Sequence, residues 1–337
     1  MSRPFLIRTA LAAAIMVAVS PGVSFACDFC GCLLGINPYY TLSDRITLTM
    51  LWQQAMHPAG GFGINAPHLK IAAGAVGTGY AALYSAGAPR LYHGGSIEST
   101  VPTYESRGTV EIAVEHHFGD HLMATGIVPL MILNERGDRL LSVRGIGDPS
   151  LLIHYVAAFD LAPGTRATFL AGAGADIPLG SDNLVDARGV RLDPRLQPGS
   201  GTADFLGNVR GILQREKWTL AVDVLGRTNG VNSYGDRIGS SLGVTMDVSR
   251  DIVRSNQDLF AIVGTAGLRS EMAATDRVHG AVDPASGFTA AYAKLGAQLV
   301  YSDLRITLTA LIPMYDHRAP GGDSEGTRIA AGAGFEF

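Results

Sequence analysis

The chain has 337 residues, of which 47% are hydrophobic and only 17% are charged, and its formal net charge is −4. A mean hydropathy of +0.20 excludes a disordered chain, and the slight excess of acid excludes a basic surface for nucleic acid. Soluble domains carry about 25% charged residues, so this chain lacks the polar coat of a large water-soluble protein. Beyond the N-terminus no stretch approaches the ~20 apolar residues of a membrane helix. The composition therefore favours a membrane protein of weak hydropathy.

Residues 1–26 are predicted to be a signal peptide. A short basic start is followed by an apolar run over 11–19, and the small residues Ser24 and Ala26 precede Cys27. This pattern is typical of a secretory cleavage site, so we expect an exported mature chain that begins at Cys27. Acylation of Cys27 is the alternative, although Ser24 stands where a lipoprotein usually has leucine.

The predicted periplasmic segment 27–44 holds all three cysteines of the chain, Cys27, Cys30 and Cys32. In an oxidising compartment one disulfide with a thiol left over is one interpretation. The other is a site for copper or zinc, because three thiolates in six residues suit a soft metal. Haem attachment is excluded because no histidine follows the Cys-x-x-Cys pair.

From residue 45 onward polarity alternates with a period of two, which predicts β-strands. In 109–118, for example, Ile112 and Val114 share one face, whereas Glu111 and Glu115 share the other. Each strand therefore has one face suited to lipid and one suited to water.

About twelve strands of this kind are predicted, with short and long connections in alternation. They span 45–56, 107–118, 121–133, 148–159, 165–178, 203–216, 217–229, 237–249, 258–272, 288–301, 304–316 and 327–337. Strands of 10–15 residues are longer than those of soluble sandwiches, typically 5–6 residues. The pattern predicts an all-β fold, a transmembrane antiparallel up-and-down β-barrel over 45–337 with a long loop at 57–106. A hairpin at 68–85 would raise the count to fourteen.

Charged residues within the strands are predicted to face the lumen, because Arg or Lys facing lipid at mid-depth costs roughly 2–4 kcal/mol. The candidate lumen residues are Glu111, Glu115, His117, Arg210, Asp223, Asp247, Lys294, Arg305 and Arg328. Their mixed signs predict pairing across the lumen. Such pairs either set selectivity for a solute or only neutralise one another.

Four segments carry a resemblance to a known family. They are Gly-Ile-Gly-Asp-Pro at 145–149, Asp-Ile-Pro-Leu-Gly at 176–180, the Leu-Gln-Pro-Gly-Ser-Gly stretch within 196–205, and the terminal Phe-Glu-Phe at 335–337. The sequence over roughly 145–337 resembles Gram-negative outer-membrane transporters of the meta-cleavage pathway of phenol degradation, which are related in architecture to long-chain fatty-acid transporters. The resemblance implies uptake of small hydrophobic or aromatic compounds. It also implies that the barrel assembly machinery recognises the final aromatic residue.

We therefore expect a channel or transporter for small solutes in the cell outer membrane, in contact with outer-membrane lipid and lipopolysaccharide. A metal-handling barrel that uses its N-terminal thiols and a purely structural or partner-docking barrel remain alternatives. We expect no enzymatic activity, because no local signature joins the scattered serines to His154. No nucleic-acid partner and no cofactor other than copper or zinc is expected.

Overall fold

A computed structural model describes residues 43–57, 103–136, 140–186, 189–255, 260–284, 286–318 and 324–337. The predicted signal peptide, the three cysteines and the hairpin at 68–85 lie outside these residues, as does most of the predicted loop 57–106. No helix in the described part is long and apolar enough to cross a membrane.

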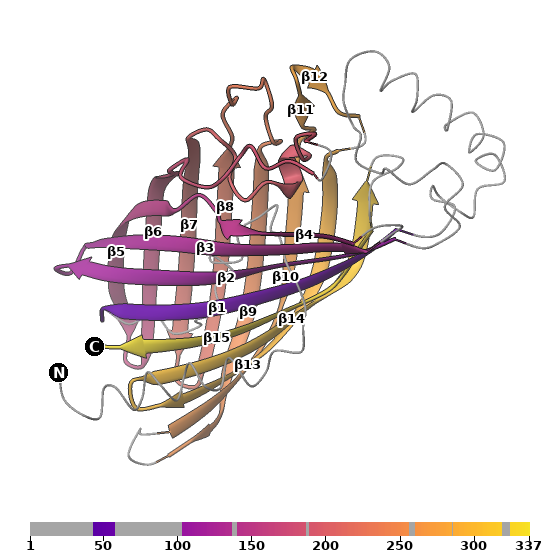
Figure 1. The fold of residues 1–337 in the computed structure, drawn as a ribbon. Helices are drawn as coiled ribbons and strands as arrows, with labels where there is room; N and C mark the ends of the chain where they lie inside the picture. The colour runs from indigo at the N-terminus through magenta and orange to yellow at the C-terminus, as the bar shows by residue number, and fades with distance from the viewer. Residues whose placement is uncertain are drawn as a thin grey trace, which may run out of the picture.

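The described strands form one antiparallel sheet that closes on itself as a barrel of twelve strands (Figure 1). The strands are β1 (Arg45–His57), β2 (Thr103–Phe118), β3 (Leu122–Arg136), β4 (Leu140–Ile146), β5 (Ser150–Ala162), β6 (Thr165–Asp176), β7 (Asp204–Arg215), β8 (Trp218–Thr228), β9 (Ser241–Arg254), β10 (Phe260–Ala273), β13 (Phe288–Tyr301), β14 (Leu304–Arg318) and β15 (Ser324–Glu336). Neighbours in this order pair with each other, except that β4 and β5 both pair with β3 and occupy one position in the wall, and β1 pairs with both β2 and β15. This last pairing closes the wall, so the alternative of fourteen strands does not hold.

All twelve predicted strands are present, and the prediction of an all-β transmembrane barrel is confirmed. The prediction was wrong for one stretch, because β4 lies within 134–147, which was predicted to be a loop. Both β4 and β5 pair with β3, β4 opposite residues 130–136 and β5 opposite 122–127. They therefore share one position in the wall and are separated by a break at 147–149. The adjacent Leu140 and Leu141 interrupt the alternation, which explains why this short strand escaped detection.

Two further differences concern the connections. Strand β9 continues to Arg254, through a stretch predicted to be a turn. The predicted loop 273–287 contains a small hairpin of β11 (Arg277–Val278) and β12 (Ala281–Val282), which forms a separate two-stranded sheet.

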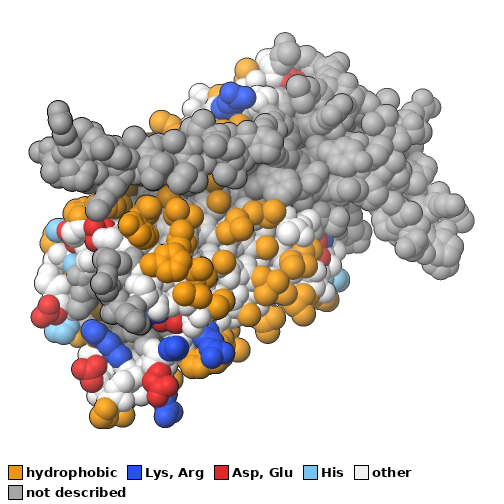
Figure 2. All heavy atoms as spheres, turned by 90° about the horizontal axis from the view of Figure 1, so that it is seen from below, with side chains coloured by type: hydrophobic (Ala, Val, Ile, Leu, Met, Phe, Trp, Pro, Cys, Tyr) orange, Lys and Arg blue, Asp and Glu red, His pale blue; other side chains and the backbone are white. Residues whose placement is uncertain are grey.

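Burial alternates along the strands as the period of two predicts. In β5 the side chains of Leu152, His154 and Val156 are buried, whereas the intervening Ile153 and Tyr155 are about half exposed. Figure 2 shows a broad area of hydrophobic side chains on one face of the wall, with charged side chains gathered toward one end. An apolar exterior and a closed hydrogen-bond ladder are what a β-structure needs within lipid.

Aromatic side chains gather at the end of the barrel that carries the short turns. They are Phe118, Tyr155, Phe159, Trp218 and Tyr301, which are between 49% and 59% exposed and lie near the turns at 119–121, 163–164, 216–217 and 302–303. Trp and Tyr favour the boundary between lipid and water, so these residues mark one edge of the membrane-spanning wall.

Candidate functional site: the barrel interior and its mouth

The middle of the barrel contains a buried ion pair between two predicted lumen residues. Lys294 of β13 donates from Nζ to Oδ2 of Asp247 of β9 at 2.6 Å, and the two residues are 2% and 5% exposed. Asp223 of β8 is also buried and lies directly opposite Arg210 of β7 in the strand register. Both signs of charge therefore meet on this side of the interior.

A second buried group surrounds Arg328 of β15. Its guanidinium donates to Oε1 of Glu271 at 2.9 Å and to the hydroxyl of Tyr292, also at 2.9 Å. Glu271 also accepts a hydrogen bond from Nε of Arg269, and Arg269 donates to Thr245 at 3.2 Å. The arginine of β15 thus reaches a carboxylate of β10, three strand positions away, with β14 and β13 between them.

The remaining predicted residues lie apart from these two groups. Glu111 of β2 is 1% exposed and is opposite Thr49 of β1. Nearer the short-turn end, Arg305 makes a two-point contact with Glu336 at 2.7 and 2.9 Å, and Glu115 pairs with Arg45. The nine predicted residues are therefore distributed along the interior and do not form one cluster.

His117 contacts Asp44, which stands just before β1. The backbone N–H of His117 donates to Asp44 Oδ1 at 2.8 Å, and the ring of His116 lies 2.6 Å from Oδ2. These hydrogen bonds, that of the His117 backbone first, hold the pKa of the Asp44 carboxyl below its usual range. The contact ties the start of β1 to the end of β2.

The sequence argument missed Arg269, Glu271 and Tyr292. The signal was present, because Arg269 and Glu271 lie two residues apart in the predicted strand 258–272 and must share a face. Arg269 and Glu271 alternate with the apolar Leu268 and Met272, which would have placed the two charged side chains inside. Leu268 and Met272 are indeed 53% and 45% exposed on the outer face.

At the opposite end, three of the four segments that carry the family resemblance, 145–149, 176–180 and 196–205, converge on Asp148. This carboxylate lies in the break between β4 and β5. Its Oδ1 accepts from the N–H of Gly180 at 2.8 Å, while Oδ2 accepts from the N–H and hydroxyl of Ser200 at 2.6 and 2.9 Å. One side chain therefore holds both ends of the loop 177–203 against the wall.

Close backbone contact explains the glycines in these segments. A Cβ at Gly199 would lie 2.5 Å from the backbone of Gly180, and one at Gly180 would lie 2.9 Å from the backbone of Gly147. Real Cβ atoms do not approach so closely, so the three chain segments can meet only where side chains are absent.

A second acidic pair lies beside this contact. Asp176 ends β6 and Asp204 begins β7. The guanidinium of Arg227 of β8 forms an ion pair with Asp176 at 2.7 Å and donates a hydrogen bond to Asp204 at 2.8 Å. Asp204 also accepts from the N–H of Gly230 at 3.0 Å. The ends of four neighbouring strand positions, from β5 to β8, are thus linked by charged side chains.

The loop 177–203 folds over the mouth of the barrel, where it meets the loops 229–240 and 274–287. We call these three loops the mouth cluster. Leu192 and Leu196 of the first loop pack on Leu133 of β3 and Val143 of β4. The short 3₁₀ turn η2 (Pro194–Leu196), capped by Asp193, positions Leu196 for this contact.

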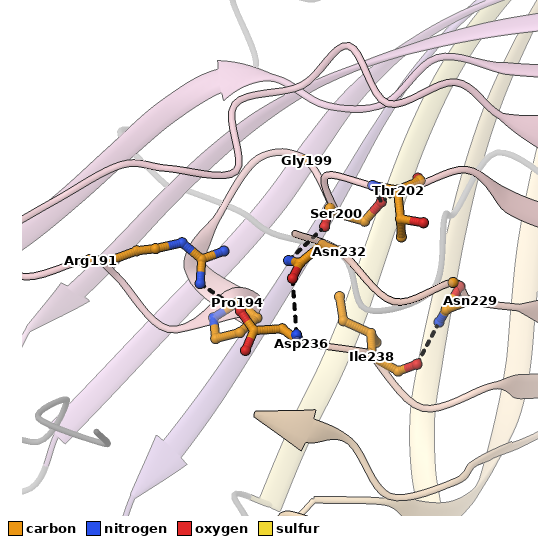
Figure 3. Close-up of a pocket in the computed structure, with 10 residues that line it drawn as sticks. Arg191, Pro194, Gly199, Ser200, Thr202, Asn229, Asn232, Asp236 and Ile238 are labelled. Atoms are coloured by element: carbon orange, nitrogen blue, oxygen red, sulfur yellow. Dashed lines mark hydrogen bonds and ion pairs between the residues drawn. The ribbon is translucent and has the colours of Figure 1, made fainter. Parts of the chain in front are cut away.

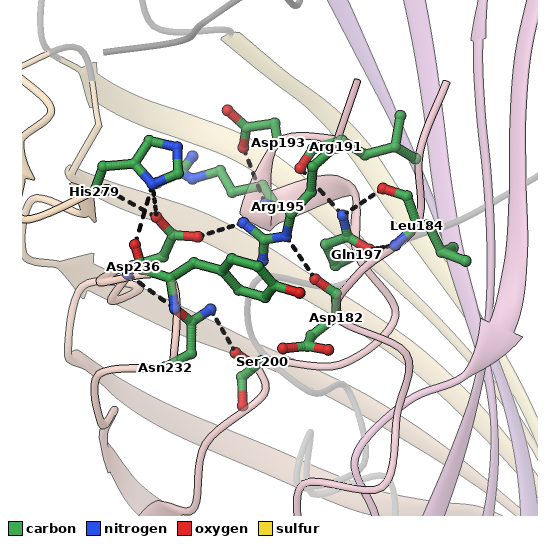
Figure 4. Close-up of polar contacts among 12 residues, drawn as sticks. Asp182, Leu184, Arg191, Asp193, Arg195, Gln197, Ser200, Asn232, Asp236 and His279 are labelled. Carbon is green, nitrogen blue, oxygen red and sulfur yellow. Dashed lines mark hydrogen bonds and ion pairs between the residues drawn. The ribbon is translucent and has the colours of Figure 1, made fainter. Parts of the chain in front are cut away.

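Ion pairs join the three loops to one another (Figure 4). Arg191 contacts Asp236 at 2.5 Å and Arg195 contacts Asp276 at 2.6 Å, so the first loop is bound to each of the other two. The pocket between Arg191, Ser200, Asn232 and Ile238 has a volume of only about 10 Å³ (Figure 3). This is room for about one water molecule, so the loops pack closely around this pocket.

Metal-binding side chains do not gather in this region. Among the described residues there is no group of three or more His, Cys, Asp or Glu side chains placed to hold a metal. Cys27, Cys30 and Cys32 lie outside the described residues, so the predicted copper or zinc site stays a prediction. The charged groups of the interior and mouth instead bind each other.

Comparison with solved structures shows which class of fold this is. The chain is similar to the crystal structure of an outer-membrane channel from Pseudomonas putida F1, with a TM-score of 0.58 and 12% identity over 95% of this chain and 100% of that chain. A NanC porin (TM-score 0.36, 8% identity, 86% and 100% covered) and a Pseudomonas aeruginosa FadL homologue (0.33, 9%, 88% and 90%) are more distant and carry no argument. No family model and no curated protein matches the sequence.

The chain therefore has the fold of an outer-membrane β-barrel, and its predicted location in the outer membrane is confirmed. Within that class, its fold resembles that of the P. putida channel.

Proposed function

We propose that this barrel is an outer-membrane channel for small, uncharged solutes of hydrophobic or aromatic character. The observation that supports it is the pairing of interior charges. Lys294 is paired with Asp247, and both Arg269 and Arg328 contact Glu271, so the charge of each group is offset by a neighbour of opposite sign. A charged solute would have to give up its water among groups that are already paired, whereas a neutral solute would lose less.

The mouth cluster supports a restricted rather than an open route. Its three loops are joined by ion pairs, and the loop 177–203 packs on the inner side of β3 and β4, so it narrows the route through this end. A wide water-filled pore would not need such a cover. The family resemblance adds small hydrophobic or aromatic compounds as the solute class.

Proteoliposome swelling tests the proposal. We expect a neutral phenol to enter faster than a benzoate of similar size or a neutral hexose. In the Glu271→Gln variant Arg269 and Arg328 lose their shared carboxylate, so benzoate entry should rise severalfold. Asp160→Asn, at an exposed position near the short turns, is the matched control. Equal entry of phenol and benzoate into vesicles that contain the wild-type protein contradicts the proposal. If phenol, benzoate and hexose all fail to enter, the result supports the structural alternative.

The metal-handling alternative depends on the three cysteines, which lie outside the described residues, so it needs a test of its own. If the thiols form the site, copper or zinc binding should be lost in the triple variant Cys27→Ser, Cys30→Ser, Cys32→Ser. Unchanged metal binding and copper tolerance in that variant would dispose of this alternative.

A further inference from the structure

The outer surface of the wall has an apolar groove near the mouth. It is an open hollow of about 740 Å³ over β7, β8, β9, β10 and β13. Phe205, Leu242 and Met272 line it and are 67%, 37% and 45% exposed, at positions that alternate with the buried Asp204, Gly243 and Glu271. The groove therefore faces the lipid and not the lumen.

Two glycines make the hollow. Gly207 and Gly226 line the groove on neighbouring strands, and a Cβ built at either would meet nothing closer than 3.9 Å. No packing contact requires glycine at these positions. Their effect is to leave space on a surface that is otherwise covered by apolar side chains, and none of the residues lining that space is a carboxylate.

Above the groove two arginines stand directly opposite each other. Arg237 and Arg277 exchange both backbone hydrogen bonds, at 2.8 and 2.7 Å, which places their side chains on the same side of the bridge. Within the described residues neither guanidinium has an ion pair. Like charges directly opposite each other are destabilising, so this arrangement suits an anion that binds both.

The two arginines lie on the side of the bridge that faces away from the ion pairs of the mouth cluster. Their flanking residues turn toward the mouth cluster, since Asp236 binds Arg191 and Asp276 binds Arg195. Because side chains alternate along extended chain, Arg237 and Arg277 point to the side of the bridge opposite these two aspartates. Arg277 is exposed, whereas its neighbours Asp276 and Val278 are buried.

The spacing between arginines and groove matches the depth of a lipid headgroup. Ser240 and Ala274 line the groove, are joined by a 2.8 Å backbone hydrogen bond, and each lies three residues from its arginine. At about 3.3 Å per residue of fully extended chain, this separation is at most roughly 10 Å. The polar layer of a membrane extends roughly 5–8 Å beyond the hydrocarbon on each side, so phosphates there lie within reach of the two long side chains.

We propose that this surface is a binding site for a phosphorylated, acylated lipid of the outer leaflet, the chemistry of the lipopolysaccharide anchor. An acyl chain occupies the groove between Phe205, Leu242 and Met272. A phosphate binds between Arg237 and Arg277. This site does not depend on the proposed transport function, since it lies on the other face of the wall.

Native mass spectrometry of the detergent-purified full-length mature protein tests the site, with added lipid A that carries two, one or no phosphates. We expect retention to fall with each phosphate removed, and to fall at least tenfold for doubly phosphorylated lipid A in the Arg237→Ser, Arg277→Ser double variant. The matched control is Arg166→Ser, Arg215→Ser, which removes two exposed arginines near the short-turn end. Resistance to SDS without boiling reports that each variant is folded.

A second variant tests the groove by itself. Gly226→Leu adds a side chain that fills the hollow without touching the arginines, and should also lower lipid A retention severalfold. Inorganic phosphate, the remaining probe, should bind weakly to all of these proteins. Unchanged lipid A retention in the double arginine variant, or equal retention of lipid A without phosphate, overturns the proposal, and so does unchanged retention in Gly226→Leu.

Discussion

Lys294 and Asp247 show how a single buried charge depends on its partner. Both are almost out of contact with water and only 2.6 Å separates their polar atoms. Removing one partner of such a pair leaves a charge that is neither hydrated nor neutralised, whereas replacing both with apolar groups is often nearly neutral. The pair therefore contributes to specificity of the interior more than to net stability.

The Lys294→Met variant is expected to lower the free energy of unfolding by about 3–5 kcal/mol, because Asp247 stays behind without its ammonium partner. The double variant Lys294→Met, Asp247→Leu should recover most of that loss. Urea unfolding of the refolded barrel in lipid vesicles measures both. If the double variant is as unstable as the single one, packing and not charge holds this part of the interior.

Alternation in the sequence predicts which charged residues are turned away from lipid, but not which of them meet. Arg328 and Glu271 come from strands that are not neighbours, and their contact depends on the curvature of the whole wall. Arg210 and Asp223, in contrast, are cross-strand neighbours around a tight turn, and their proximity follows from counting residues outward from Glu216.

At the scale of elements, long alternating strands were predictable because each displays its two faces within ten residues. Strand β4 was not, since seven residues with two adjacent leucines carry little periodicity. The mouth cluster was not predictable either. Asp148, Gly180 and Ser200 are separated in sequence and meet only because β4, β5 and β6 bring their ends together. The family resemblance did mark all three segments, without showing that they touch.

The loop 177–203 should depend on the Asp148 clamp. Asp148→Ala removes three hydrogen bonds to a carboxylate, each of a kind worth about 1.5–3 kcal/mol. We expect faster proteolysis within this loop and faster entry of solutes into proteoliposomes, with the strands still folded. Asp120→Asn, in the exposed turn at the other end, is the control. Unchanged cleavage of the loop would mean that Leu192 and Leu196 hold it without the clamp.

For the whole molecule, stability of the barrel requires that every strand be paired on both sides. Strand β15 pairs with β14 and β1, so deleting residues 324–337 leaves two open edges. We expect this truncated chain to show no SDS-resistant, heat-modifiable form after refolding in detergent. Phe337→Ala removes only the terminal aromatic side chain, which is 64% exposed, and should refold in vitro. A heat-modifiable truncated chain would show that the wall closes by another pairing.

The seam between β1 and β15 also constrains how the protein is made. Arg45 pairs with Glu336, so the two strands that close the wall are widely separated in the sequence. A pairing this distant in sequence forms slowly, because a large loop entropy is lost before any contact compensates for it. Before β15 is in place, the edges of β1 and β14 have unpaired backbone N–H and C=O groups. Another chain can extend such an edge into a mixed sheet, so self-association competes with closure until β15 takes its place.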